Sequence, residues 1–303
     1  MKVALIIPLY KQSMYWHRLL SGIQKQSLKP TIVYIVVDRP SDDLGALDST
    51  GKPINAKWNA LGEISKLNAS IHDIDIKLIV IDKVPSGVQR TKAASPVFLA
   101  GYARNLGIEH AVKDGCDIFV FMDGDCIPQD DFIKSHVELC STKLPMMSIG
   151  RRRESKLRWM DQREVSSNLT HLRLFDKMGS LINNPDLLKQ CLIVWSCNVA
   201  MNLSAIKLIY KFNETYYQRT EIFNNAFNGV WGGEDSFLGI TAWYCRVFMH
   251  TLGNIKSGVE HIDHQRPESI YNKEHKIFFD TQCEMLRKKL VLNPINLNLL
   301  DYT

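Results

Sequence analysis

Short apolar segments alternate with helical segments through the first half of the chain. The apolar segments are rich in Val, Ile and Phe, and the segment between the first two spaces Tyr15, Leu19 and Ile23 as one face of a helix does. Strands and helices that alternate in this way form a parallel sheet with helical crossovers. The sequence therefore predicts an α/β fold, with strands over residues 3–9, 31–37, 77–81 and 117–122 and helices over residues 13–26 and 101–113.

The last of these strands runs directly into two carboxylates. Asp123 and Asp125 flank Gly124 in the sequence Phe-Met-Asp-Gly-Asp-Cys-Ile-Pro. Ligands of α/β sheets bind at the carboxyl ends of the strands. Two acids placed there repel each other unless a cation lies between them, and a hard divalent cation also holds the phosphates of a nucleotide. The alternative is an Asp-Gly turn that only ends a strand, and these eight residues do not distinguish the two.

A second acidic pair follows two glycines in Trp231-Gly-Gly-Glu-Asp. Glycines let the backbone approach a ligand closely, and Trp231 can stack on the apolar face of a sugar. Glu234 and Asp235 are adjacent, so their side chains point in different directions. One can therefore hold an acceptor hydroxyl while the other removes its proton. The alternative is a loop whose Glu-Asp pair begins a helix and interacts with the helix dipole.

A third polar segment reads His261-Ile-Asp-His264-Gln-Arg-Pro. Histidine is a common ligand of transition metals, and manganese accepts mixed oxygen and nitrogen ligands. A surface or capping histidine is the alternative for either residue. The remaining pattern predicts strands over residues 192–201 and 257–262, a helix over residues 235–248 and a C-terminal helix after residue 268.

The composition indicates what kind of protein this is and where it is located, but it says little about the reaction. The chain is 45% hydrophobic and 23% charged, with a net charge of +5, which is ordinary for a globular protein and too small to establish nucleic-acid binding. No run approaches transmembrane length and no signal peptide is recognisable. Seven scattered cysteines without a Cys-x-x-Cys pair predict reduced thiols and a cytoplasmic location.

The order of the motifs carries a family resemblance. Ala103-Arg-Asn-Leu-Gly precedes the Asp-x-Asp strand, and Trp-Gly-Gly-Glu-Asp and His-Gln-Arg-Pro follow it. This order resembles family 2-like glycosyltransferases of the GT-A fold, particularly the branch of β-1,4-galactosyltransferases and chondroitin polymerase. The resemblance implies one domain over residues 1–270, with a Rossmann-like nucleotide-sugar-binding half (1–127) and a mixed acceptor-binding and catalytic half (128–270). Residues 271–303 would form a C-terminal helix and tail.

The resemblance also implies a role for each motif residue. Asp125 and His264 match the metal ligands, Asp123 would contact the ribose or the metal, and His261 is a weaker candidate ligand. Asp235 matches the catalytic base of inverting members and Glu234 a residue that holds the acceptor. Three further sets complete the site: Pro8, Tyr10 and Asp38 around the nucleoside, Arg104 near the nucleotide, and Trp231 at the sugar or acceptor.

The implied activity is a metal-dependent, inverting hexosyltransferase reaction. A sugar would pass from a nucleotide diphosphate sugar, expected to be a UDP-sugar, to a hydroxyl group of a glycan, with Mn²⁺ or Mg²⁺ as cofactor. One departure affects the nucleotide base. The family often has a second acid after the second strand, where this chain has Arg39 after Asp38. Arginine has only donors and cannot accept the N3–H of uracil, so Asp38 or Asp42 would take that role.

Two other functions fit parts of the sequence. Arg151, Arg152, Arg153 and Arg158 with Trp159 could follow a phosphate backbone, which suggests a DNA glycosyltransferase acting on hydroxymethylated pyrimidines. A solvated cationic loop, or one that folds over the diphosphate, is the alternative for this segment. A nucleotide-sugar-binding protein without catalysis is a further class. Nucleotidyl transfer is disfavoured, because no glycine-rich phosphate loop follows the first strand.

Overall fold

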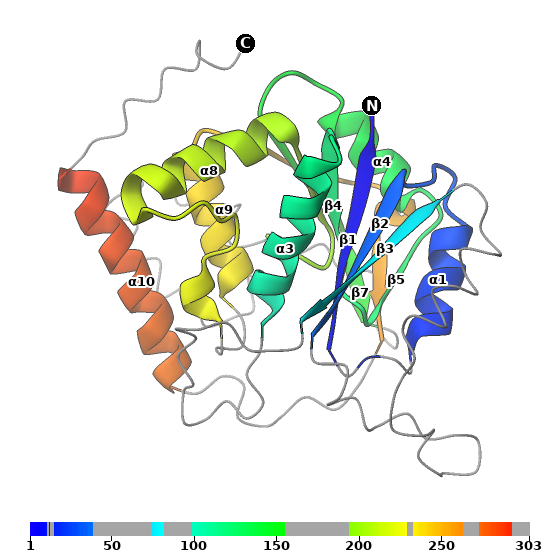
Figure 1. The fold of residues 1–303 in the computed structure, drawn as a ribbon, viewed down its shortest axis with the longest axis horizontal. Helices are drawn as coiled ribbons and strands as arrows, with labels where there is room; N and C mark the ends of the chain where they lie inside the picture. The colour runs from blue at the N-terminus through cyan, green and yellow to red at the C-terminus, as the bar shows by residue number, and fades with distance from the viewer. Residues whose placement is uncertain are drawn as a thin grey trace.

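The fold is built around one large twisted sheet. A computed structural model describes residues 1–10, 12, 15–38, 74–81, 99–154, 194–228, 233–262 and 273–292. Seven strands hydrogen-bond in the order β3-β2-β1-β4-β8-β6-β9, and helices cover both faces of the sheet (Figure 1). The predicted α/β class is confirmed.

The first half of the chain follows the predicted alternation. Its elements are β1 (Val3–Leu9), α1 (Trp16–Gln24), β2 (Ile32–Asp38), β3 (Asp75–Ile81), α3 (Ala100–Lys113) and β4 (Ile118–Phe121). All four strands are parallel, since β1 pairs with β2 and β4 and β2 pairs with β3. The sequence-based ranges agree with these elements to within a few residues.

The second half is mixed. It contains β5 (Cys126–Pro128), α4 (Phe132–Cys140), β6 (Met146–Ile149), β7 (Arg152–Glu154), β8 (Val199–Asn202), α8 (Leu203–Tyr217), η3 (Asn225–Phe227), α9 (Glu234–Tyr244), β9 (Phe248–Thr251), η4 (Ile255–Ser257), β10 (Val259–His261) and α10 (Lys273–Leu292). Strand β8 runs antiparallel to both of its neighbours, β4 and β6. Beyond β4, the second half of the chain therefore continues the parallel sheet as a mixed sheet, as the resemblance implied.

Two predicted elements of this half have different bounds. The strand expected over residues 192–201 begins only at Val199, because the amide of Asn198 bonds the carbonyl of Trp195 in a turn. The helix expected over residues 235–248 ends at Tyr244, because Arg246 adopts a left-handed conformation (φ 59°) and turns the chain into β9. Both turns depend on backbone geometry that the apolar pattern does not encode.

Strands β1, β2 and β4 bury both faces, which explains their continuous apolar sequences. On β1, Ala4 and Ile6 pack into the cluster that contains residues of α3, α8 and α9, whereas Leu5 and Ile7 pack into the cluster that contains residues of α1 and α4. Gly107 lets α3 approach the sheet closely, since a Cβ there would lie 2.5 Å from Cγ2 of Ile6. The packing fixes α3, and therefore Arg104, against the centre of the sheet.

A three-stranded sheet, β5-β10-β7, forms beside the end of β4. Strand β10 pairs antiparallel with β5, which places His261 opposite Cys126. The sheet therefore brings His261 next to the Asp-x-Asp motif across more than a hundred residues of sequence. The predicted division between residues 127 and 128 falls inside β5.

The described cysteines are buried free thiols: Cys116, Cys126, Cys140, Cys197, Cys245 and Cys283. Within the described ranges, no helix combines the length and the apolar character needed to cross a membrane.

Candidate active site

The candidate site lies where the strand order reverses. From β1 the chain adds β2 and β3 on one side and then β4 on the other, so the switch point falls between β1 and β4. Ligands of open α/β sheets bind in the crevice at this point. Pro8 lies at the end of β1 and Tyr10 directly follows that strand, Asp38 ends β2, and Asp123 and Asp125 lie in the turn after β4. The predicted nucleoside residues and the two aspartates of the Asp-x-Asp motif thus share one edge of the sheet.

Gly124 is required between the two acids. A Cβ at this position would lie 2.1 Å from Cδ2 of Leu9 and 3.2 Å from the carbonyl oxygen of Pro8. The turn after β4 therefore packs directly on the end of β1. This close contact places both aspartates beside the end of that strand.

Asp125 is buried and meets two side chains from distant segments. Its Oδ2 accepts a hydrogen bond of 3.0 Å from Nε2 of Gln12 and lies 3.5 Å from Nε2 of His261. Its carbonyl accepts from the amide of Ile262 at 2.8 Å, which ties the motif to the end of β10. Asp125 and His261 thus present an oxygen and a nitrogen ligand side by side.

A divalent cation fits this pair chemically, because manganese accepts carboxylate and imidazole ligands together. Among the described residues, no three His, Cys, Asp or Glu side chains converge as a metal site. The described part of the chain therefore offers two neighbouring candidate ligands, Asp125 and His261. His264, the predicted ligand, lies outside the described residues.

Arg104 joins the two acidic motifs. It is 3% exposed, and its Nη2 donates to Oδ1 of Asp123 at 2.6 Å while its Nη1 donates to Oε1 of Glu234 at 3.2 Å. The guanidinium also stacks on Phe223, 5.3 Å from the ring centroid. Burial disfavours the charge, but the two carboxylates outweigh it and hold the pKa of Arg104 above its ordinary value. Arg104 therefore contacts protein acids directly, close to the expected nucleotide position.

Glu234 and Asp235 form the first turn of α9. Gly233 precedes them in a left-handed conformation (φ 93°) and acts as the N-cap residue. The sequence suggested, as an alternative, that the acidic pair begins a helix. The structure shows this arrangement, since both acids lie in the first turn of α9. This position at the helix end is compatible with a role in the candidate site, because Glu234 is buried and Asp235 is half-buried.

The environments of the two acids differ. Oδ1 of Asp235 accepts from the amide of Ser236 at 2.8 Å and Oδ2 from the amide of Ser196 at 3.4 Å. Burial raises the pKa of Asp235 above its ordinary value, although Arg104 and these amides lower it. Burial and the nearby Asp235 raise the pKa of Glu234 to about 7. Oε2 of Glu234 is buried and has no hydrogen-bond partner among the described residues, so it can receive one from a ligand.

The structure thus brings together most of the predicted residues. A series of charged side chains runs from Asp123 through Arg104 to Glu234, with Asp235 next to it. Asp125, two residues after Asp123 in the sequence, lies beside His261. Trp231 lies outside the described residues. Gln12 and Ser196 contact the two motifs but were not predicted, because neither carries a local sequence signal.

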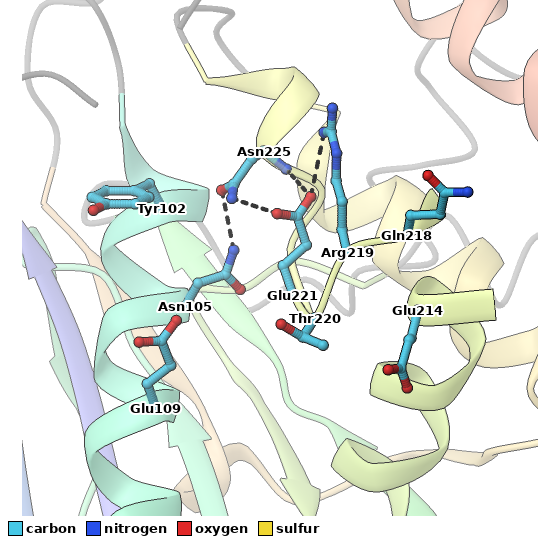
Figure 2. A pocket seen from close by; sticks show the side chains of 9 residues that line it. All are labelled: Tyr102, Asn105, Glu109, Glu214, Gln218, Arg219, Thr220, Glu221 and Asn225. Atoms are coloured by element: carbon cyan, nitrogen blue, oxygen red, sulfur yellow. Dashed lines mark hydrogen bonds and ion pairs between the residues drawn. The ribbon is translucent and has the colours of Figure 1, made fainter. Parts of the chain in front are cut away.

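A pocket of about 590 Å³ lies elsewhere, between α3 and the segment after α8. Figure 2 shows that its central polar groups bond one another: Asn105 donates to Asn225, and Asn225 donates to Glu221. Arg219 lies 3.7 Å from the same glutamate. These groups satisfy each other, and none of the candidate acids lines the pocket. We therefore place the candidate chemistry at the strand ends and not here.

A nucleotide-type sheet with acidic motifs near its switch point is the arrangement expected of glycosyltransferases of the GT-A fold. Residues 98–209 match the family model described as glycosyl transferase family 2. This stretch includes α3, β4 and the Asp-x-Asp motif. The match confirms the predicted glycosyltransferase class, whereas the particular branch of the family stays a prediction.

Solved structures show the same fold over the whole chain. The structure resembles residues 1–349 of S. aureus TarS in complex with UDP-GlcNAc, with a TM-score of 0.58, 14% identity, and coverage of 100% of this chain and 69% of that one. It also resembles S. aureus TarS, with a TM-score of 0.54, 15% identity, and coverage of 100% and 41%. No curated protein sequence matches the chain significantly.

Proposed function

We propose that this chain transfers a sugar from a UDP-sugar to an acceptor hydroxyl with inversion at the anomeric carbon, with the help of a divalent cation. The observation that carries the proposal is the Arg104 bridge, which holds the acid after β4 and the acids of α9 at one site. A UDP donor is supported by the similar TarS structures, which were solved with UDP-GlcNAc and with UDP.

Asp125 and His261, with His264 as the predicted further ligand, are the residues that would hold Mn²⁺ or Mg²⁺. The bound cation would act as a Lewis acid and neutralise charge on the leaving diphosphate. Asp123 is fixed by Arg104 but keeps 30% of its side chain exposed. One oxygen of Asp123 is therefore available to a ribose hydroxyl or to the cation.

Asp235 is the proposed general base. Its carboxylate would take the proton of the acceptor hydroxyl while the hydroxyl oxygen bonds to the anomeric carbon. The bond from that carbon to the diphosphate breaks on the opposite face, and the diphosphate leaves with the bonding electrons. Burial strengthens the base by raising the pKa of Asp235, and a base with a higher pKa accepts the proton more readily. Glu234, fixed by Arg104 on one oxygen, would hold the acceptor with the other.

The acceptor we propose is a glycan. The cationic segment that suggests DNA is only described as far as Glu154. There, the guanidinium of Arg152 stacks on Trp195 at 5.1 Å, and Arg153 pairs with Glu260. These two cations are engaged within the protein, which favours a structural role for them. DNA glycosylation remains the second candidate, and retention on duplex DNA that weakens with salt would support it.

A thermal-shift panel of nucleotide sugars, with and without Mn²⁺, tests the proposal. We expect a UDP-sugar to raise the melting temperature only in the presence of the metal, because binding to the native state stabilises it. The selected donor is then tested for UDP release in the presence of candidate acceptors. Metal-independent shifts would contradict the role of the cation, and binding without any UDP release would favour the non-catalytic alternative.

A further inference from the structure

The C-terminal helix contacts the residue that precedes the candidate catalytic acids. A Cβ on Gly233 would lie 3.0 Å from Cδ2 of Phe279 and 3.1 Å from Cε1 of Phe227. The rings of Phe227 and Phe279 lie 6.1 Å apart between centroids. Gly233 is therefore enclosed by two aromatic rings, one of which comes from α10.

Gly233 sets the direction in which both acids leave the backbone. It caps α9, and its carbonyl accepts the first hydrogen bond of that helix, 2.9 Å from the amide of Phe237. A shift or rotation of this turn changes two contacts directly: the 3.2 Å bond between Arg104 and Glu234 and the 3.4 Å contact between Ser196 and Asp235. The two rings around Gly233 therefore influence the positions of Glu234 and Asp235.

We propose that Phe279 is a positioning residue for the glycosyl transfer: its ring holds the Gly233 turn so that Glu234 and Asp235 keep their places in the site. The inference rests on the proposed function, since it assigns these two acids to catalysis. It gives α10, which Figure 1 shows beside α9, a role in catalysis beyond completing the core.

The docking of α10 does not depend on Phe279 alone. Cys283 and Leu286 are buried further along the helix, and Nζ of Lys289 lies 4.2 Å from the ring centroid of Tyr217. Leu286 is seven residues from Phe279, about 10 Å along a helix. Removal of the Phe279 ring should therefore leave the helix in place and free only the glycine turn.

Steady-state kinetics on three variants separate positioning from packing. Phe279→Ala should lower kcat for UDP release about 10- to 100-fold with little change in the KM of the UDP-sugar, because small displacements of catalytic groups have effects of this size. Phe279→Leu, which keeps an apolar side chain on the turn, should recover most of the rate. Leu286→Ala should lower the melting temperature but keep kcat close to the wild-type value. Equal losses of kcat in Phe279→Ala and Leu286→Ala would overturn the inference.

Hydrogen exchange tests the inference without turnover. The amides of residues 234–240, followed by mass spectrometry in the folded protein, should exchange faster in Phe279→Ala than in the wild type and in Leu286→Ala, since the enclosed turn begins this helix. Unchanged exchange in Phe279→Ala would overturn the positioning role. If the wild type releases no UDP from any donor, the proposed function fails, whereas the exchange result still decides whether Phe279 holds the turn.

Discussion

Nη1 of Arg104 lies 3.2 Å from Oε1 of Glu234, although 130 residues separate them in the sequence. The same guanidinium bonds Asp123, so one buried cation serves an acid from each half of the chain. Loss of the cation would leave two buried or half-buried carboxylates close together. Arg104 is therefore central both to the stability of the site and to its charge balance.

Replacement of Arg104 should be costly. Arg104→Met should lower the free energy of unfolding by about 3–5 kcal/mol, because it removes one partner of a buried charge cluster. Urea unfolding followed by circular dichroism measures the loss. Arg219→Ala is the matched control: its side chain is 52% exposed and pairs with Glu221, so its cost should be about 0–1 kcal/mol. Similar losses in both variants would contradict a special role for Arg104.

Asp235→Asn should remove the general base with almost no change in shape. Transfer should fall by about 10²- to 10⁴-fold, the usual contribution of a general base. The Kd of the UDP-sugar, measured by calorimetry with Mn²⁺ present, should stay near the wild-type value, because the proposal assigns Asp235 to the acceptor and not to the donor. A variant that turns over at a near-normal rate would disprove the assignment.

The metal ligands are separable by titration. Asp125→Asn and His264→Ala should each raise the Mn²⁺ concentration for half-maximal activity by at least about tenfold, since even partners of metal ligands have effects of this size. His261→Ala is measured beside them, because Nε2 of His261 lies 3.5 Å from Oδ2 of Asp125. A higher metal requirement in only one histidine variant identifies that residue as the ligand. An unchanged titration in Asp125→Asn would exclude Asp125 as a metal ligand.

His136 makes stability depend on pH. Its ring is fully buried between the hydroxyl of Ser148 and the side-chain oxygen of Asn198, and burial lowers its pKa to about 4. The unfolded chain, with an ordinary pKa near 6.5, binds a proton more readily than the native state between these values. The contribution of the neutral His136 ring to the free energy of unfolding is therefore complete above pH 6.5, and it is lost as the pH falls toward 4. It amounts to about 3 kcal/mol over that window.

Urea unfolding at pH 7.5 and at pH 4.5 measures this effect. His136→Gln keeps hydrogen-bonding groups but does not titrate, so its stability should fall less than that of the wild type between the two pH values. Parallel losses in the two proteins would show that other groups account for the pH dependence.

Local patterns in the sequence were enough to predict most of the elements and the motifs. Continuous apolar strands and helical spacing are local patterns that repeat within ten or so residues, so the parallel first half was predictable to within a few residues. The two acidic motifs were recognisable for the same reason, because each is contained in a few consecutive residues. The bounds of β8 and α9 were less predictable, because a turn at Asn198 and a left-handed Arg246 set them.

Which side chains meet depends on long-range packing, which the sequence pattern does not show. Arg104 contacts Asp123 and Glu234 because α3 packs on the centre of the sheet while α9 packs beside it, and no local pattern records that arrangement. His261 reaches Asp125 because β10 pairs with β5, and Gln12 reaches it from the end of β1. Strand pairing and helix packing join residues that are far apart in the chain. The sequence thus determined which groups can react, and the folded structure determined which of them share a site.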